Sequence, residues 1–152
     1  MRDRTSSPAG HRDLADGDRA GSTRDFDVYG LSFRVSGDWP EVLGALSLDF
    51  AWFARGAGTP AADVELTVER GTPEWDSYGS APAAFVTPRN VVYQQGERTI
   101  VDYFGRAVTV LDRARKRVLI RGDDAALVHE AAYQFMLSRA GTHFDEIGWT
   151  RS

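Results

Sequence analysis

The chain has 152 residues, of which 42% are hydrophobic and 11% aromatic, so one folded domain of ordinary size can be built from it. The formal net charge of -4 at neutral pH argues against a nucleic-acid-binding protein, because such proteins usually carry a basic face. Cysteine is absent, which excludes disulfides, zinc–thiolate sites and cysteine nucleophiles. No apolar run approaches the ~20 residues of a membrane span, and the N-terminus lacks the apolar segment of a secretory signal, so we expect a cytoplasmic protein that binds no membrane.

The first 25 residues are predicted to form a disordered tail. They contain five arginines and five aspartates but no isoleucine, valine, phenylalanine, tyrosine or tryptophan. A segment of this composition buries too little apolar surface to offset the entropy lost on ordering. We therefore expect residues 1–25 to be the tail and residues 26–152 to be a single α+β domain.

A strand and a helix are predicted to begin the domain. Hydrophobic residues alternate over 28–35, the period of a half-buried strand, at Tyr29, Leu31, Phe33 and Val35. A helix is then expected over 39–55, with Asp38 as its N-cap and Pro40 in its first turn. Residues at helical spacing should face the core: Trp39, Val42, Leu43, Leu46, Phe50 and Phe53.

The second half of the domain is predicted to be mostly sheet. Residues 64–68 alternate as a strand, and residues 70–88, rich in Gly, Pro and Ser, are expected to be a loop. Four closely spaced strands of an antiparallel meander should follow, over 90–94, 98–103, 107–112 and 117–121. A second helix over 124–139 should bury Leu127, Val128, Ala131, Phe135 and Arg139.

This order of elements predicts an α+β fold. The sheet should be antiparallel, with the meander in its C-terminal half and the two main helices packed on one face. A doubly wound parallel fold would need more helices between its strands.

No catalytic motif is complete in the sequence. There is no phosphate-binding loop, no dinucleotide-binding glycine motif, no nucleophile elbow and no paired zinc-ligand motif. We therefore expect no catalytic residue, cofactor or metal, and this favours a protein that is not an enzyme by itself. One alternative stays open: a small ligand-binding protein or enzyme that uses the helix face of His129, Glu130 and Tyr133, with His129 as a base beside a carboxylate.

A basic run lies between the last two predicted strands, at Arg113, Arg115, Lys116 and Arg117. It could contact phosphate or nucleic acid, or it could be a charged hairpin tip that keeps the sheet soluble. The run has no interleaved aromatic residues and the protein is acidic, so the second interpretation is favoured.

Each predicted helix also carries apolar residues on its outer face, where polar residues would be expected. Leu48 and Trp52 are four residues apart on the first helix, and the second has a similar row at His129, Tyr133 and Leu137. Scattered exposed apolar residues are common and could explain these positions. The alternative is that these five residues form an interface for a protein partner.

The layout resembles a known family. The segment YGLSFRV at 29–35, the aromatic-rich helix, the segment DVELTV at 63–68, the hairpin series and the segment FMLSRAG at 135–141 are similar to the N-terminal region of HPr-kinase-like proteins. These are the divergent relatives associated with peptide natural-product biosynthesis, in which a P-loop kinase-like domain follows. The family's ATP-binding lysine and phosphate loop have no counterpart in this sequence, so no catalytic residue is carried over. The resemblance implies either a stand-alone N-terminal module or a fragment of a longer protein, without kinase activity of its own. Together with the outer apolar rows, it favours a non-catalytic accessory module that docks onto a kinase-like domain or a protein or peptide substrate.

Overall fold

The computed structural model describes residues 23–56, 61–75 and 82–151, and the side chains as far as residue 141. Within them lies one eight-stranded sheet, in the order β1-β2-β3-β8-β7-β6-β5-β4. The strands are β1 (Arg24–Val28), β2 (Leu31–Gly37), β3 (Val64–Arg70), β4 (Ala83–Val86), β5 (Val91–Gln95), β6 (Arg98–Asp102), β7 (Ala107–Asp112) and β8 (Arg117–Gly122). The helical elements are α2 (Pro40–Asp49), the short 3-10 helix η1 (Ala51–Phe53) and α3 (Ala125–Arg151).

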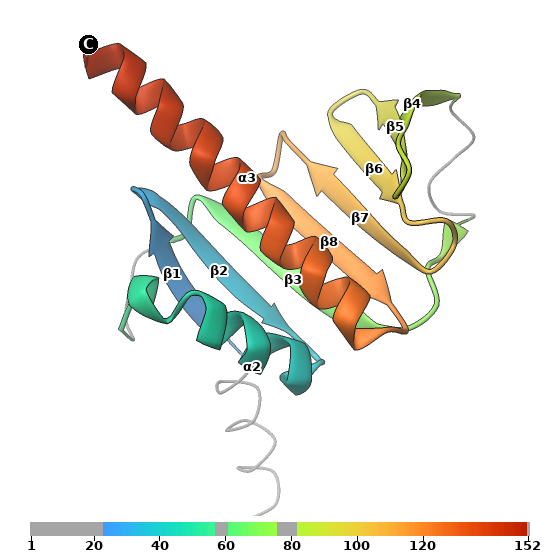
Figure 1. Cartoon of the computed structure of the whole chain (residues 1–152), viewed down its shortest axis with the longest axis horizontal. Coiled ribbons are helices and arrows are strands. Elements are labelled where there is room, and N and C mark those ends of the chain that lie inside the picture. The colour runs from blue at the N-terminus through green and yellow to red at the C-terminus, as the bar shows by residue number, and fades with distance from the viewer. Residues whose placement is uncertain (1–22, 57–60, 76–81, 152) are drawn as a thin grey trace, which may run out of the picture.

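Both helices lie on one face of the sheet, as predicted (Figure 1). Helix α2 packs on β2, α3 packs mainly on β8, and the two helices also contact each other. The meander strands β4, β5 and β6 extend beyond α3, toward the edge of the sheet that is opposite β1 (Figure 1). The predicted α+β class, the C-terminal meander and the one-sided placement of the helices are therefore confirmed.

The sheet is mostly antiparallel, but β3 pairs in parallel with both of its neighbours, β2 and β8. Helix α2 connects β2 to β3 by crossing back over the sheet, and a crossover of this kind places two strands in parallel. The chain then passes to the opposite edge at β4, and the antiparallel meander returns through β5, β6 and β7 to set β8 beside β3. The sequence pattern did not predict the parallel centre, because it depends on which strands become neighbours.

The predicted strand over 28–35 is in fact the end of one strand, a tight turn and most of the next. Tyr29 and Gly30 have φ angles of 55° and 89°, which reverse the chain between β1 and β2. The Asp27 carboxylate accepts a hydrogen bond from the Gly30 N–H (3.0 Å) and so stabilises this turn. Arg24 already belongs to β1, so the last residues of the expected tail are part of the sheet, while 1–22 lie outside the described residues.

Three predicted boundaries also change. Helix α2 ends at Asp49 instead of 55, because Phe50 leaves the helical conformation before η1 begins. Helix α3 continues through Gly141 to Arg151 instead of ending at 139, and the predicted loop over 70–88 contains β4. Asp38 is not the N-cap of α2: Trp39 occupies that position, and the Asp38 carboxylate accepts the Arg70 N–H instead (3.1 Å).

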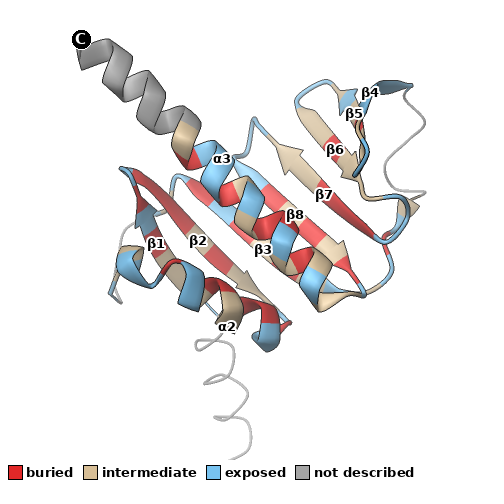
Figure 2. Cartoon of the chain, viewed as in Figure 1, coloured by how far each residue is buried: buried red, intermediate tan, exposed pale blue. Residues whose placement is uncertain are grey.

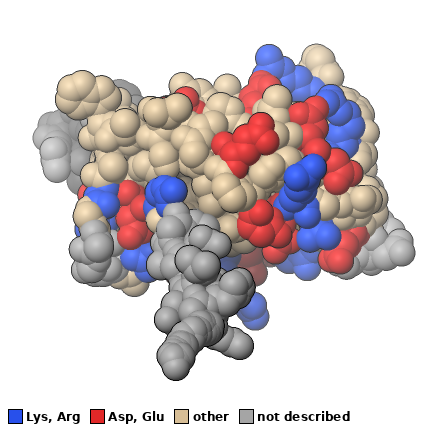
Figure 3. Space-filling view, turned by 90° about the horizontal axis from the view of Figure 1, so that it is seen from below, with Lys and Arg blue, Asp and Glu red and all other residues tan. Residues whose placement is uncertain are grey.

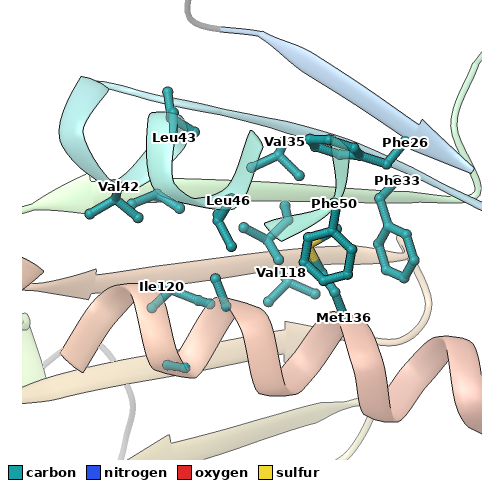
Figure 4. Close-up of a cluster of buried hydrophobic side chains, with 14 of the residues drawn as sticks. Phe26, Phe33, Val35, Val42, Leu43, Leu46, Phe50, Val118, Ile120 and Met136 are labelled. Carbon is teal, nitrogen blue, oxygen red and sulfur yellow. The ribbon is translucent and has the colours of Figure 1, made fainter. Parts of the chain in front are cut away.

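The core lies between the two helices and the sheet (Figure 2). Of the inner residues predicted for the first helix, all but the half-buried Phe53 are buried, and they meet β2, β3, β8 and Met136 of α3 (Figure 4). The predicted inner face of α3 was partly wrong. Val128 and Ala131 are buried, but Arg139 is exposed, and Ala132, Met136 and Ala140 are buried in addition. The buried stripe is rotated because α3 packs against α2 as well as against the sheet.

Helix α3 begins at a side-chain cap that should make stability pH-dependent. The Asp124 carboxylate accepts hydrogen bonds from the N–H groups of Leu127 (3.3 Å) and Ala126 (3.0 Å), and it pairs with Arg106 (2.7 Å). The hydrogen bond from Leu127 is the main cause that lowers the pKa of this carboxyl. A carboxyl whose pKa is lower in the folded state stabilises the protein above its unfolded pKa, and this stabilisation is lost as pH falls through the folded pKa.

We therefore predict that Asp124→Ala lowers the melting temperature at pH 7 by removing the cap. The difference between variant and wild type should begin to shrink as the pH falls below roughly 4, the ordinary pKa of an aspartate, because the unfolded wild type then binds a proton that the folded carboxylate resists. Thermal unfolding followed by circular dichroism between pH 7 and pH 3 measures this. A difference that stays constant over that range would contradict the role of the ionised carboxylate.

Candidate functional site

The outer residues of α2 and η1 are the most exposed large apolar side chains that the structure describes. Trp52 is 96% exposed and Leu48 is 81% exposed, as expected for an outer row. The segment from Val42 to Ala54 contains one charged residue, Asp49. In Figure 3, which views the molecule from below, charged side chains gather on the right and in a smaller group at the lower left, and few lie on the upper left. We call Leu48 and Trp52 the α2–η1 surface.

His129 and Tyr133 lie in the seam between the helices and do not project freely. The His129 Nε2 atom is 2.5 Å from the Asp49 Oδ2 atom, so the one charged residue between Val42 and Ala54 has a partner on α3. The Tyr133 ring packs at 5.6 Å from the Phe50 ring, and both His129 and Tyr133 are half-buried. These two residues therefore join α3 to α2. Leu137, one turn further along α3, is 39% exposed.

Glu130 points to the other side of α3, toward the meander. Its Oε2 atom accepts a hydrogen bond from the Arg89 guanidinium (3.2 Å), which comes from the turn between β4 and β5. The groove at this place has a volume of about 640 Å³ and lies between α3 and two turns of the meander. His129, Glu130 and Tyr133 are thus directed to different neighbours, and the structure does not gather them around one reacting position.

The groove beside Glu130 contains residues that the sequence did not single out. Tyr103 is half-buried there; burial raises the pKa of its phenol, and its hydroxyl is 3.2 Å from the Thr109 hydroxyl. Phe104, with a φ of 56°, stays 55% exposed at the groove's edge, and Arg106 pairs with Asp124 (2.7 Å). The sequence signal that could have indicated this groove was the bulky Phe104 directly before Gly105 in a short turn. Such turns often need a positive φ, which a bulky side chain rarely adopts.

The basic run around the β7–β8 turn does not present one face. Arg115 lies 3.9 Å from Asp112, Arg117 lies 3.8 Å from Glu65 and Arg113 lies 3.8 Å from Glu97, so three of its four charges have acidic neighbours. The Arg113 guanidinium donates to the Gly96 carbonyl (2.7 Å) and to the Thr99 hydroxyl. This arrangement resembles a charged hairpin tip more than a continuous basic stripe for nucleic acid.

The described residues hold no cluster of three histidine, aspartate or glutamate side chains that could bind a metal ion. Of the helices in the same residues, none combines the length and the apolar character needed to cross a membrane. Comparison of the chain with known protein families, with curated proteins and with solved structures finds no match.

Proposed function

We propose that this chain is a non-catalytic docking module that binds a partner protein through the α2–η1 surface. The observation that carries the proposal is the 96% exposure of Trp52, next to Leu48 at 81%, on a segment with one charged residue. Tryptophan is enriched among the residues that dominate the binding energy of protein interfaces. A large apolar side chain left in water in this way gains free energy when a partner covers it.

The seam with α3 supports the proposal because it keeps this surface in place. Phe50, which directly follows α2, is buried, and its ring is 5.6 Å from that of Tyr133 and 5.8 Å from that of Phe26. The contact of Asp49 with His129 holds the end of the helix from the other side. Leu48 and Trp52 thus extend from a rigid base, which reduces the entropy lost when a partner binds.

The partner that we propose is a kinase-like domain of the HPr-kinase-like type, and a protein or peptide substrate is the alternative. This choice rests on the resemblance in layout described above. The absence of a phosphate-binding loop from the sequence fits an accessory role, since a module without this loop would depend on another domain for phosphoryl transfer.

The substitution Trp52→Ala tests the proposal. It should weaken binding to a separately purified P-loop domain of an HPr-kinase-like protein by about 30-fold, which corresponds to the ~2 kcal/mol typical of an interface hot spot. The melting temperature should change little, because the side chain is almost fully exposed. Isothermal titration calorimetry measures the affinity, and circular dichroism measures the melting temperature.

Phe85→Ala is the matched control. Phe85 is another exposed aromatic residue (55%), but it lies on β4 at the far edge of the sheet. Its replacement should leave the affinity unchanged. The proposal would be wrong if the wild-type chain fails to bind the P-loop domain, or if both substitutions weaken binding equally.

A further inference from the structure

A second hollow lies at the end of the sheet where the β1–β2 and β7–β8 turns meet the middle of α3. Its volume is about 730 Å³, within the range of roughly 300–1,000 Å³ that is usual for small-molecule sites. Three basic side chains line it, Arg113, Lys116 and Arg139, together with one acidic side chain, Asp63. We call this hollow the cationic cavity. It is separate from the α2–η1 surface and from the groove beside Glu130.

The floor of the cationic cavity is apolar and preformed. Leu31 and Val64, from β2 and β3, are buried, and Leu111 and Phe135 are half-buried beside them. The Phe135 ring packs edge-on against the Phe33 ring at 6.5 Å, which fixes its orientation. A short apolar group of a ligand could therefore lie on this floor without rearrangement of the core.

The charges at the rim are unbalanced. The Asp63 carboxylate is already engaged, because its Oδ2 atom accepts hydrogen bonds from the Ser32 N–H (2.9 Å) and from the Ser32 hydroxyl (3.1 Å). Arg113 is held by the β5–β6 turn, where its guanidinium donates to the Gly96 carbonyl (2.7 Å) and lies 3.8 Å from the Glu97 carboxylate. No side chain within the described residues forms an ion pair with Lys116 or Arg139. Two cationic side chains of the cavity therefore remain available to an anion.

The backbone at Lys116 adds a second observation. Its φ angle is 56°, in the left-handed region that glycine and asparagine adopt more readily than lysine. The Lys116 carbonyl accepts the Glu65 N–H (3.0 Å), so this conformation is fixed by the pairing of the chain with β3. The turn therefore holds the base of the lysine side chain rigidly beside the apolar floor.

We infer that the cationic cavity binds a ligand that joins a carboxylate to a short apolar chain. The apolar chain would lie against Phe135 and Leu111, and the carboxylate would bind between Lys116 and Arg139. Desolvated ion pairs and apolar burial would contribute together, which is the usual combination in small-ligand sites. The same chemistry is offered by a free carboxylic acid and by the C-terminal carboxylate of a peptide that ends in an apolar residue.

Calorimetric titration with octanoate, below the concentration at which it forms micelles, tests the inference. Octanoate should bind, and octylammonium, with the same chain and the opposite charge, should bind at least about ten-fold more weakly. A second titration uses the peptide acetyl-Ala-Ala-Leu and its C-terminal amide. Tighter binding of the free-carboxylate peptide than of octanoate would identify a chain terminus as the source, and the reverse order would identify a free acid. Failure of both carboxylates to bind, or equal binding of octylammonium, would overturn the inference.

Two substitutions locate the site without disturbing the fold. Lys116→Gly suits the positive φ and removes the ammonium, and Arg139→Gln removes a charge from an exposed helix position. Each should weaken octanoate binding by about ten-fold while the melting temperature is kept or, for Lys116→Gly, raised. Arg115→Gln is the control, because Arg115 belongs to the same turn but does not line the cavity. Equal affinities of all three variants would place octanoate elsewhere and contradict the assignment.

Discussion

Replacing Gly37 with alanine should destabilise the fold by about 3 kcal/mol or more, the sum of a steric and a conformational cost. Gly37, at the end of β2, has a φ of 148°, a conformation that residues other than glycine rarely adopt. An added Cβ atom would lie 1.9 Å from the Val68 carbonyl oxygen of the neighbouring strand β3. That oxygen also accepts the Asp38 N–H (3.2 Å), so it cannot move away without breaking the entry into α2. Urea denaturation of the purified variant measures the loss.

Gly44→Ala is the matched control for this prediction. Gly44 lies within α2, and a Cβ atom added there would have no neighbour within 4 Å. Because alanine favours the helix over glycine, this variant should gain roughly 1 kcal/mol of stability. A loss at Gly44, or a Gly37 variant as stable as wild type, would contradict the described packing of β2 against β3.

Truncation of Leu46 to alanine should cost about 2–5 kcal/mol, the range found for buried leucines. Leu46 is fully buried at the centre of the cluster that joins α2 to the sheet and to α3 (Figure 4). Its removal would leave a cavity that neighbours from several elements would have to fill. The free energy of unfolding, measured in urea, should fall without a change in the slope of the transition.

Leu48→Ala provides the comparison in the same helix. The side chain of Leu48 is 81% exposed, so its truncation should change stability by less than about 0.5 kcal/mol. The pair separates the inner face of α2 from the proposed docking surface. Equal losses at Leu46 and Leu48 would mean that the outer residue is covered, and the docking proposal would lose its basis.

The candidate sites show how far sequence patterns reach. The exposure of Leu48 could be predicted, because helical spacing alone places it opposite the buried Leu46. Trp52 is exposed as predicted, but it lies in η1 after α2 has ended, so the predicted continuous helix is not the reason for its position. The environment of His129 could not be predicted in the same way. Its partner, Asp49, is 80 residues away in the chain and comes close to it when α2 and α3 pack side by side.

The cationic cavity depends on the tertiary structure to a still greater degree. Lys116 and Arg139 come from the β7–β8 turn and from α3, and Leu31 comes from the first hairpin. The basic run around Lys116 was visible in the sequence, but the side on which each of its members lies was not. That side is fixed by the register of β7 with β8, since a shift of one residue would turn each side chain of the shifted strand to the opposite face of the sheet.

The sequence by itself determined β3, the strands β5 to β8, the presence of the two main helices and the residues of α2 that are buried. Local alternation and helical spacing are properties of neighbouring residues, so β3, the meander and the inner stripe of α2 could be predicted from them. The tertiary structure decided the parallel pairing of β3 with β2 and β8, the buried stripe of α3 and the convergence of charges at the cationic cavity. These features depend on contacts between segments far apart in the chain, whose free energy no local pattern records.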